Sequence, residues 1–222
     1  SLEQTVFEGS ADHLTFEKLK LLKKNGVDRL TLGVQTLDET VLKESNRFQN
    51  NDEFFRCYHE ARDAGIPYIN VDLMVGLPGQ SMESVLMTLE KVIGLKPDMI
   101  HCHPFFPSEF SSFSKEGRRL TDADLKRRKL LAELTMKVKK KHGYRETPYD
   151  ADGLTPEAIN VQLADAIRYN SSYLGLGAGA VSHATGVLRY GNTNEVGLYT
   201  DTHLKGECPP VHGKILTQRD EM

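Results

Sequence analysis

Four short apolar segments alternate with amphipathic stretches in the first half of the chain. They span Thr5–Glu8, Leu30–Val34, Ile69–Val75 and Met99–His103. Short runs that are rich in Val, Ile and Leu are typical of buried strands, and near-continuous apolar runs are typical of strands covered on both faces. Because a helical pattern separates each pair, we predict parallel strands joined by helical crossovers, in the order β-α-β-α-β-α-β.

Helix start and stop signals delimit the stretches between these strands. Thr15 is a predicted N-cap, and Asn25-Gly26 is a typical helix end. The predicted helices are Phe16–Lys24, Glu39–Glu44, Asp52–Ala64, and a helix that Ser81 caps and that runs to Ile93. Both a barrel and an open doubly wound sheet fit this order, and either fold places its chemistry at the carboxyl ends of the strands.

The alternation ends near Pro104. A Ser-rich, aromatic loop at 104–114 precedes a long predicted helix, Thr121–His142, and a weaker one, Pro156–Asn170. We therefore expect a partial barrel over residues 1–107 and a C-terminal α+β extension over residues 108–222. The last residues resemble an N-cap at Thr217 with no helix body after it, so we expect the extension to be truncated.

Composition excludes several classes of protein. The 222 residues carry a net charge of −3, which gives no electrostatic footprint for nucleic acid. No apolar run approaches the roughly 20 residues of a membrane-spanning helix. The three cysteines, Cys57, Cys102 and Cys208, are far apart and form no CxxC pair, which excludes a secreted disulfide framework. A reducing, cytoplasmic location is the expectation.

Four polar residues fall at or just beyond predicted strand ends: Glu8, Gln35, Arg47 and Asp72. Each also has a structural interpretation, in which Gln35 caps the next helix, Arg47 is a surface residue, and Asp72 is a buried acid satisfied by backbone N–H groups. Taken together they suit a small zwitterion with hydroxyl groups. A guanidinium holds a carboxylate, and carboxylates accept hydrogen bonds from ammonium and ribose hydroxyl groups.

Two glycine-rich segments are weaker signals. Gly76-Leu77-Pro78-Gly79-Gln80 predicts a tight turn that either makes a connection or lets backbone approach a ligand. Residues 175–179 read GxGxG without the third glycine of a dinucleotide fingerprint, and no βαβ pattern surrounds them. Close approach of backbone to a ligand or a neighbouring strand is the favoured interpretation of this second segment.

His101-Cys102-His103 is the one local cluster of metal-ligating residue types. On a strand the two histidines share a face, but two ligands do not complete a zinc site, and the sequence shows no partner carboxylate. We therefore expect no metal there, and interpret the histidines as lining a pocket at the strand end.

Several segments, taken in order, resemble the oxygen-independent coproporphyrinogen III oxidase and haem-chaperone branch of the radical S-adenosylmethionine (SAM) proteins. Residues 26–36 are similar to that family's "GvxRlSiGvQs", residues 71–80 to its "vDLiyGLPgQ", and residues 174–182 to its "lGlGpgAhS". Asn46-Arg47 resembles its "gR", and Arg189 with Asn192 resembles an Arg–Asn pair that follows. The shared order gives the resemblance its specificity.

The resemblance implies a partial (β/α)6 TIM-like barrel of which strands 3 to 6 are present. It also implies two cofactors, SAM and a [4Fe–4S] cluster, and an electron donor such as flavodoxin or ferredoxin. In the oxidases, reductive cleavage of SAM gives a 5′-deoxyadenosyl radical that starts the oxidative decarboxylation of porphyrinogen propionates. The implied substrate is thus a small molecule, a porphyrinogen or haem.

The family's SAM-contacting positions fall on Glu8, Gln35, Arg47 and Asp72, and a further one falls near Val181. The segment 104–106 aligns loosely with another contact. The family's CxxxCxxC loop and GGGTP segment are absent, so no cluster ligand is expected in this chain. As it stands it is expected to be inactive alone, with an unpaired strand edge. No catalytic residue is assigned.

Two other functions within the resemblance stay open. One is a radical SAM methyltransferase, and the other is a haem-binding chaperone without oxidase activity. Residues 104–170 are less similar to the oxidases than the rest, so the substrate is not fixed by sequence. An unrelated α/β domain is the remaining alternative.

Overall fold

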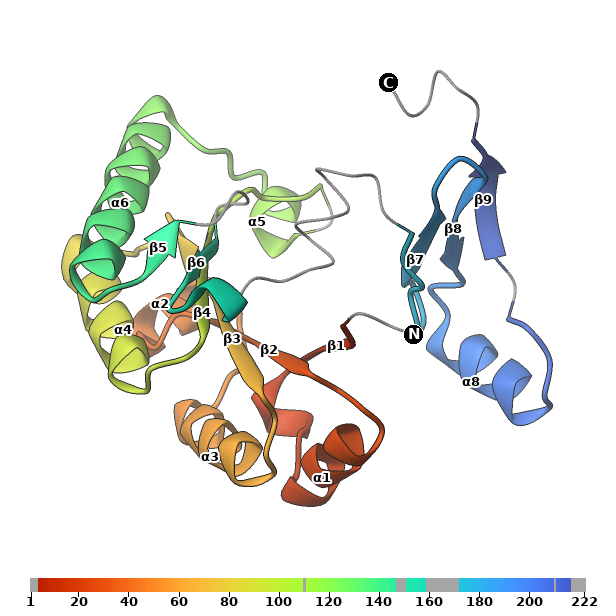
Figure 1. Ribbon diagram of the computed structural model, residues 1–222. Helices are drawn as coiled ribbons and strands as arrows, with labels where there is room; N and C mark the ends of the chain where they lie inside the picture. The colour runs from red at the N-terminus through yellow and green to blue at the C-terminus, as the bar shows by residue number, and fades with distance from the viewer. Residues whose placement is uncertain (1–3, 110, 147–150, 159–171, 210, 217–222) are drawn as a thin grey trace. The chain divides into compact units, whose positions relative to one another are not determined.

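The computed structural model describes residues 4–109, 111–146, 151–158, 172–209 and 211–216. They divide between two compact units, Ser1–Ile159 and Asn160–Met222 (Figure 1). No helix of the described residues is long and apolar enough to cross a membrane.

A mixed sheet of six strands, in the order β1-β2-β3-β4-β6-β5, forms the centre of the first unit. The first four are parallel: β1 (Val6–Gly9), β2 (Arg29–Gln35), β3 (Tyr68–Val75) and β4 (Met99–Pro104). These are the four predicted strands, and the predicted parallel α/β fold is confirmed. The short strands β5 (Arg145–Glu146) and β6 (Ala151–Gly153) continue the sheet antiparallel to β4.

Helices connect the parallel strands and also follow the last of them, β4. They are α1 (Phe16–Lys24), α2 (Glu39–Glu44), α3 (Asn51–Asp63), α4 (Met82–Gly94), α5 (Ser112–Lys115) and α6 (Asp122–Lys141). Side chains of Thr15, Ser81 and Thr121 accept hydrogen bonds from first-turn N–H groups, as N-caps do. Asp38 caps α2, so Gln35 does not serve as that cap.

The two faces of the parallel sheet differ in chemistry. One face is apolar and packs against the helices, with Leu30, Leu32, Val71 and Ile100 in a single core with Leu89 of α4. The other face, here called the polar face, carries Thr31, Asn70, Asp72, His101 and His103, whose register and contacts are given below. Side chains along these strands therefore alternate between the apolar face and the polar face, whereas the sequence predicted apolar side chains on both faces. A strand with one polar face alternates with a period of two residues.

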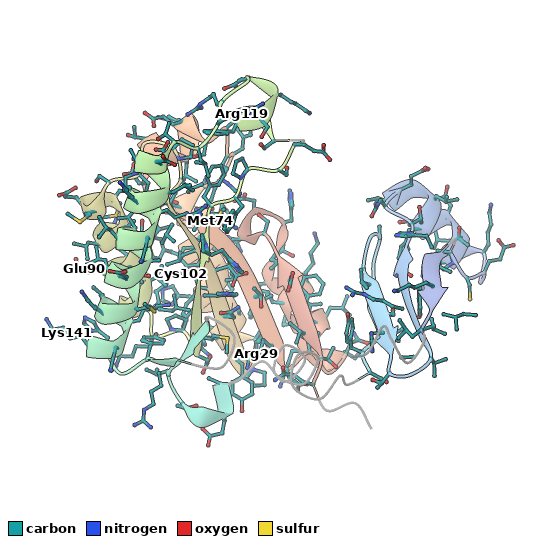
Figure 2. The ribbon with its side chains drawn as sticks, turned by 90° about the horizontal axis from the view of Figure 1, so that it is seen from above. Arg29, Met74, Glu90, Cys102, Arg119 and Lys141 are labelled. Carbon is teal, nitrogen blue, oxygen red and sulfur yellow. The ribbon has the colours of Figure 1, made fainter. Side chains whose placement is uncertain are left out.

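The first unit extends beyond residue 107, where we expected the barrel-like part to end. Its continuation packs through α6 against α4 and pairs β6 with β4. In Figure 2, Met74 and Arg29 lie toward opposite ends of the parallel strands. Arg29 is fully buried and donates to the carbonyl oxygen of Ala158 (2.7 Å) in the short 3-10 helix Pro156–Ala158.

Among its described residues, the second unit contains an antiparallel sheet of three strands and one helix. The strands are β7 (Val181–Ala184), β8 (Leu188–Asn192) and β9 (Val211–Ile215), and the helix is α8 (Val196–Leu204). Before the glycine-rich segment, an isolated bridge pairs Tyr173 with His183. Most of the predicted helix Pro156–Asn170, and the helix start at Thr217, lie outside the described residues.

Candidate functional site

Strand register brings two of the predicted site residues to the polar face. Glu8 is the register partner of Thr31, and Asp72 is the partner of both Gly33 and His101. Register partners on neighbouring parallel strands project to the same face of a sheet. The Nδ2 of Asn70 lies 3.4 Å from the Thr31 hydroxyl and donates to Asp72 Oδ1 at 2.9 Å, which links β2 and β3 across this face.

Asp72 is held by side chains. Asn70 donates to one carboxylate oxygen, and the other oxygen lies 3.6 Å from Nε2 of His103. The side chain of Asp72 is 22% exposed, so the carboxylate is partly desolvated and still open to a ligand. The structural interpretation, a buried acid satisfied by backbone N–H groups, therefore does not describe this residue.

Gln35 ends β2 in a strained conformation. Its φ is +67°, and the N–H of Thr36 donates to the carbonyl oxygen of Val34 at 2.7 Å, which closes a three-residue turn around it. Turns of this kind with a positive φ at a residue other than glycine are rare and strained. The amide folds back over Gly33, because a Cβ at Gly33 would meet Nε2 of Gln35 at 3.1 Å. Gly33 thus leaves room for the Gln35 amide beside Asp72.

A helix-ending motif directs Arg47. Asn46 adopts a φ of +52°, its N–H donates to the carbonyl oxygen of Lys43, and that of Arg47 donates to the carbonyl oxygen of Leu42. This pair of hydrogen bonds is a Schellman motif at the end of α2. Nη2 of Arg47 then reaches Sδ of Met74, 3.4 Å away on β3.

The contact places the guanidinium at the strand-end side of Asp72. Met74 is the next β3 residue on the same face as Asp72, because side chains alternate along a strand. Partial desolvation lowers the pKa of Arg47. The side chain of Arg47 is exposed and forms no salt bridge with the described residues, so it is suited to bind an anionic group of a ligand.

The side chain of Gln80 fixes the conformation of the turn Gly76–Gln80. Gln80, 1% exposed, accepts hydrogen bonds from the N–H groups of Gly76 (2.7 Å) and Leu77 (3.2 Å) and donates to the carbonyl oxygen of Met74. Gly76 has a φ of +82°, and a Cβ there would strike the side chain of Arg128. The glycine therefore serves close packing against α6.

The segment 104–106 is held by contacts with Arg128 of α6. Nη1 of Arg128 donates to the carbonyl oxygen of Phe105 at 2.6 Å, and its guanidinium lies 4.1 Å from the centre of the Phe106 ring. The predicted ligand contact by this segment stays a prediction.

In the second unit, backbone N–H groups of the glycine-rich loop 174–180 donate hydrogen bonds to acceptors within that unit. The N–H of Gly175 donates to the Ser182 hydroxyl, that of Gly177 to the Tyr199 hydroxyl, and that of Gly179 to the Thr193 carbonyl. Backbone approach is close, since a Cβ at Gly175 would lie 2.3 Å from the Val181 carbonyl oxygen. This agrees with the interpretation that the glycines admit a neighbouring strand.

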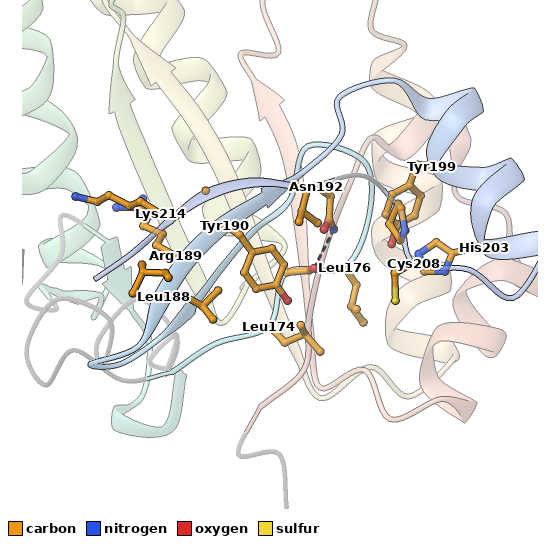
Figure 3. A pocket seen from close by; sticks show the side chains of 15 residues that line it. Leu174, Leu176, Leu188, Arg189, Tyr190, Asn192, Tyr199, His203, Cys208 and Lys214 are labelled. Carbon is orange, nitrogen blue, oxygen red and sulfur yellow. Dashed lines mark hydrogen bonds between the residues drawn. The ribbon is translucent and has the colours of Figure 1, made fainter. Parts of the chain in front are cut away.

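The same loop lines an apolar cavity of about 720 Å³ (Figure 3). Leu174, Leu176 and Leu188 line it, and Asn192 donates to the Gly175 and Gly177 carbonyl oxygens at 3.2 and 2.9 Å. Val181, the predicted fifth contact, begins β7 and is 40% exposed.

The cysteines do not fit a [4Fe–4S] cluster, which needs several thiolates around one site. Cys57 is buried in the helix-side core, where burial raises the pKa of its thiol to about 11. Cys102 also packs against this core, on the apolar face, and Cys208 belongs to the second unit.

The sequence interpretation missed the residues that organise the site. Asn70 lies two residues before Asp72, and Thr31 and Gly33 lie four and two residues before Gln35, respectively. This period-two series of polar and small residues was the available signal for a polar face. The partner carboxylate of the two histidines was also missed, because Asp72 comes from the neighbouring strand.

Comparisons with known proteins agree with this architecture. Residues 4–92 match the family model described as the radical SAM superfamily. The haem chaperone HemW of Bacillus subtilis is 28% identical over 203 residues, which cover 90% of this chain and 52% of that protein. The oxygen-independent coproporphyrinogen III oxidase of Salmonella typhimurium is 34% identical over 114 residues, which cover 50% of this chain and 24% of that protein.

A solved structure gives the same fold. Coproporphyrinogen III oxidase (HemN) from Escherichia coli superimposes with a TM-score of 0.75 at 23% identity, covering 98% of this chain and 52% of that one. The chain spans about half the length of the first of these relatives and of this structure.

Proposed function

We propose, from the premise that this chain belongs to the radical SAM superfamily, that its polar face binds SAM at the carboxyl ends of β1, β2 and β3. The observation that carries the proposal is the contact of Arg47 with Met74, which sets a guanidinium on the face that holds Asp72. A cation and carboxylates on one face match the carboxylate, ammonium and ribose hydroxyl groups of SAM.

The proposed roles follow from the chemistry of each side chain. Arg47 donates to an anionic group of the ligand, while Glu8 and Asp72 accept hydrogen bonds from its ammonium and hydroxyl groups. Gln35 offers both a donor and an acceptor from a fixed backbone position. When bound, SAM supplies the adenosyl group with which members of this superfamily begin radical chemistry. Val181 belongs to the second unit, and its contact with the adenosine stays a prediction from the sequence.

The role of this chain toward the cluster is indirect. Because the chain has three cysteines and no CxxxCxxC spacing, we propose that cluster-binding cysteines, and the docking of an electron donor, belong to polypeptide outside these 222 residues. Binding and orienting SAM is then the contribution of the chain itself.

For the whole protein we propose a porphyrinogen or haem as the small-molecule partner. An oxidase that removes propionate carboxyl groups is supported by the match to the coproporphyrinogen III oxidase. A haem chaperone is the second candidate, because two relatives named as haem chaperones align with 90% and 89% of the chain, and an anaerobic coproporphyrinogen III oxidase aligns with 91% of it.

The SAM site is tested by equilibrium binding of S-adenosylhomocysteine to the chain, measured by calorimetry. We expect a dissociation constant of about 0.1–1 mM, and at least a tenfold weakening in Asp72→Asn and Arg47→Ala, which is about 1.4 kcal/mol or more. The matched controls are Asp63→Asn and Arg119→Ala, whose side chains are exposed. Equal affinity in the site variants and the controls would overturn the proposal.

The two whole-protein candidates are separated by anaerobic assays after reconstitution with iron and sulfide. The oxidase predicts release of CO₂ from coproporphyrinogen, dependent on SAM. The chaperone predicts stable haem binding without that turnover.

A further inference from the structure

Three metal-ligating side chains meet on the polar face where β3 and β4 run side by side. Asp72 is the register partner of His101, and His103 is the next residue of β4 on the same face. One ligand atom from each of the three residues lies within 4.8 Å of the others. The structure thereby supplies the carboxylate that the sequence did not show beside the two histidines.

The distances are close to those of a metal site. Nε2 of His103 lies 3.6 Å from Oδ2 of Asp72. Two ligands bonded to one tetrahedral ion at about 2.1 Å are about 3.4 Å apart. The two imidazole rings have centroids 3.6 Å apart, so a small rotation of side chains on a rigid sheet is enough to close the set.

A further contact orients the carboxylate. Asn70 donates to Oδ1 of Asp72 at 2.9 Å, which leaves Oδ2 facing His103. Hydrogen bonds of this kind hold ligating carboxylates in known metal sites. The three residues are partly buried, so the site is open to solvent or to another ligand.

We propose that Asp72, His101 and His103 bind one divalent transition-metal ion of the zinc and ferrous iron class. Two imidazoles and one carboxylate on one face suit these borderline ions and leave coordination positions open. The site goes beyond the proposed SAM site and shares only Asp72 with it.

The test is a titration of the chain, free of any affinity tag, with Co²⁺ followed by its visible absorption, and with Zn²⁺ by calorimetry. We expect one ion per chain, displacement of Co²⁺ by Zn²⁺, and at least a tenfold loss of affinity in each of His101→Ala and His103→Ala. The control variants are His59→Ala and His142→Ala, which alter exposed histidines of the same unit.

A second measurement uses the unaltered chain, so that it does not depend on the folding of a variant. Zn²⁺ is expected to shift the imidazole NMR signals of His101 and His103 and to leave those of His59 and His142 in place. Equal binding by the site and control variants, no binding of either ion, or shifts confined to other histidines would overturn the proposal. If His101→Ala and His103→Ala lose metal binding but still bind S-adenosylhomocysteine, the metal site is distinct from the SAM site.

Discussion

At the scale of single residues, the candidate site depends on backbone positions that most residues avoid. Gln35 and Asn46 both have positive φ values, and each fixes a functional direction: Gln35 its own amide, and Asn46 the guanidinium of Arg47. Asn tolerates the left-handed region well, whereas Gln is held there by its surroundings. The loop after Gln35 is fixed by Thr88, whose hydroxyl accepts from the N–H of Leu37 at 3.1 Å.

The sequence identified the four polar site residues but not their backbone conformations. Glu8, Gln35, Arg47 and Asp72 stood out because polar groups follow or interrupt apolar strands. The pairing of Asp72 with His101 and its contact with His103 depend on strand register, which no local pattern specifies.

Cys57 gives a pH dependence of stability. Burial raises the pKa of its thiol from 9.0 to about 11, so the unfolded thiol ionises at a lower pH than the native one. Its contribution to the free energy of unfolding is therefore full below pH 9 and is lost as the pH rises from 9 to 11, by about 2 kcal/mol. Urea denaturation at several pH values measures this loss.

The test compares how steeply the free energy of unfolding falls with pH in two variants. Cys57→Ala is expected to flatten the decline between pH 9 and 11, whereas Cys208→Ala, which alters an exposed thiol, keeps it. The same slope in both variants would contradict the assignment.

At the scale of elements, caps and periodicity predicted the helices and the four parallel strands, since these carry local signals. The bounds of α1 and α2 are those predicted. The strands β5 and β6 were not predicted, because strands of two and three residues show no period. Their pairing with β4 is a tertiary interaction.

Gln80 fixes the link between β3 and α4. In Gln80→Ala, two buried N–H groups and one carbonyl lose their partners, so we expect the free energy of unfolding to fall by about 2–4 kcal/mol. Urea denaturation measures the change, with Met82→Ala, exposed in the same connection, as the control. If Gln80→Ala lost no more stability than Met82→Ala, this account of the turn would be wrong.

At the scale of the whole molecule, the hydrophobic core is distributed unevenly. Among the described residues, the buried hydrophobic side chains all belong to the first unit, and the last of them is Ala158. The second unit buries polar side chains such as Ser182 and Asn192, and Leu204 and Ile215 are each 82% exposed. The parallel order was predictable from the alternating pattern, but this imbalance was not, because sequence alone does not tell which apolar residues find partners.

Hydrogen exchange should reflect this imbalance. We expect the amides of β2 and β3 to exchange slowly, near the rate of global unfolding, and those of β8 and β9 to exchange much faster through local opening. Mass spectrometry of deuterated peptides compares the two units in one sample. Equal protection of the two sheets would show that the second unit has a stability that its burial does not explain.

The most direct test of the SAM proposal is a map of where the ligand touches the chain. Backbone amide NMR spectra recorded during a titration with S-adenosylhomocysteine are expected to shift first at Glu8, Gln35, Arg47 and Asp72 and at their neighbours on β1, β2 and β3. Shifts confined to loop 174–180, or spectra that do not change at saturating ligand, would contradict the account.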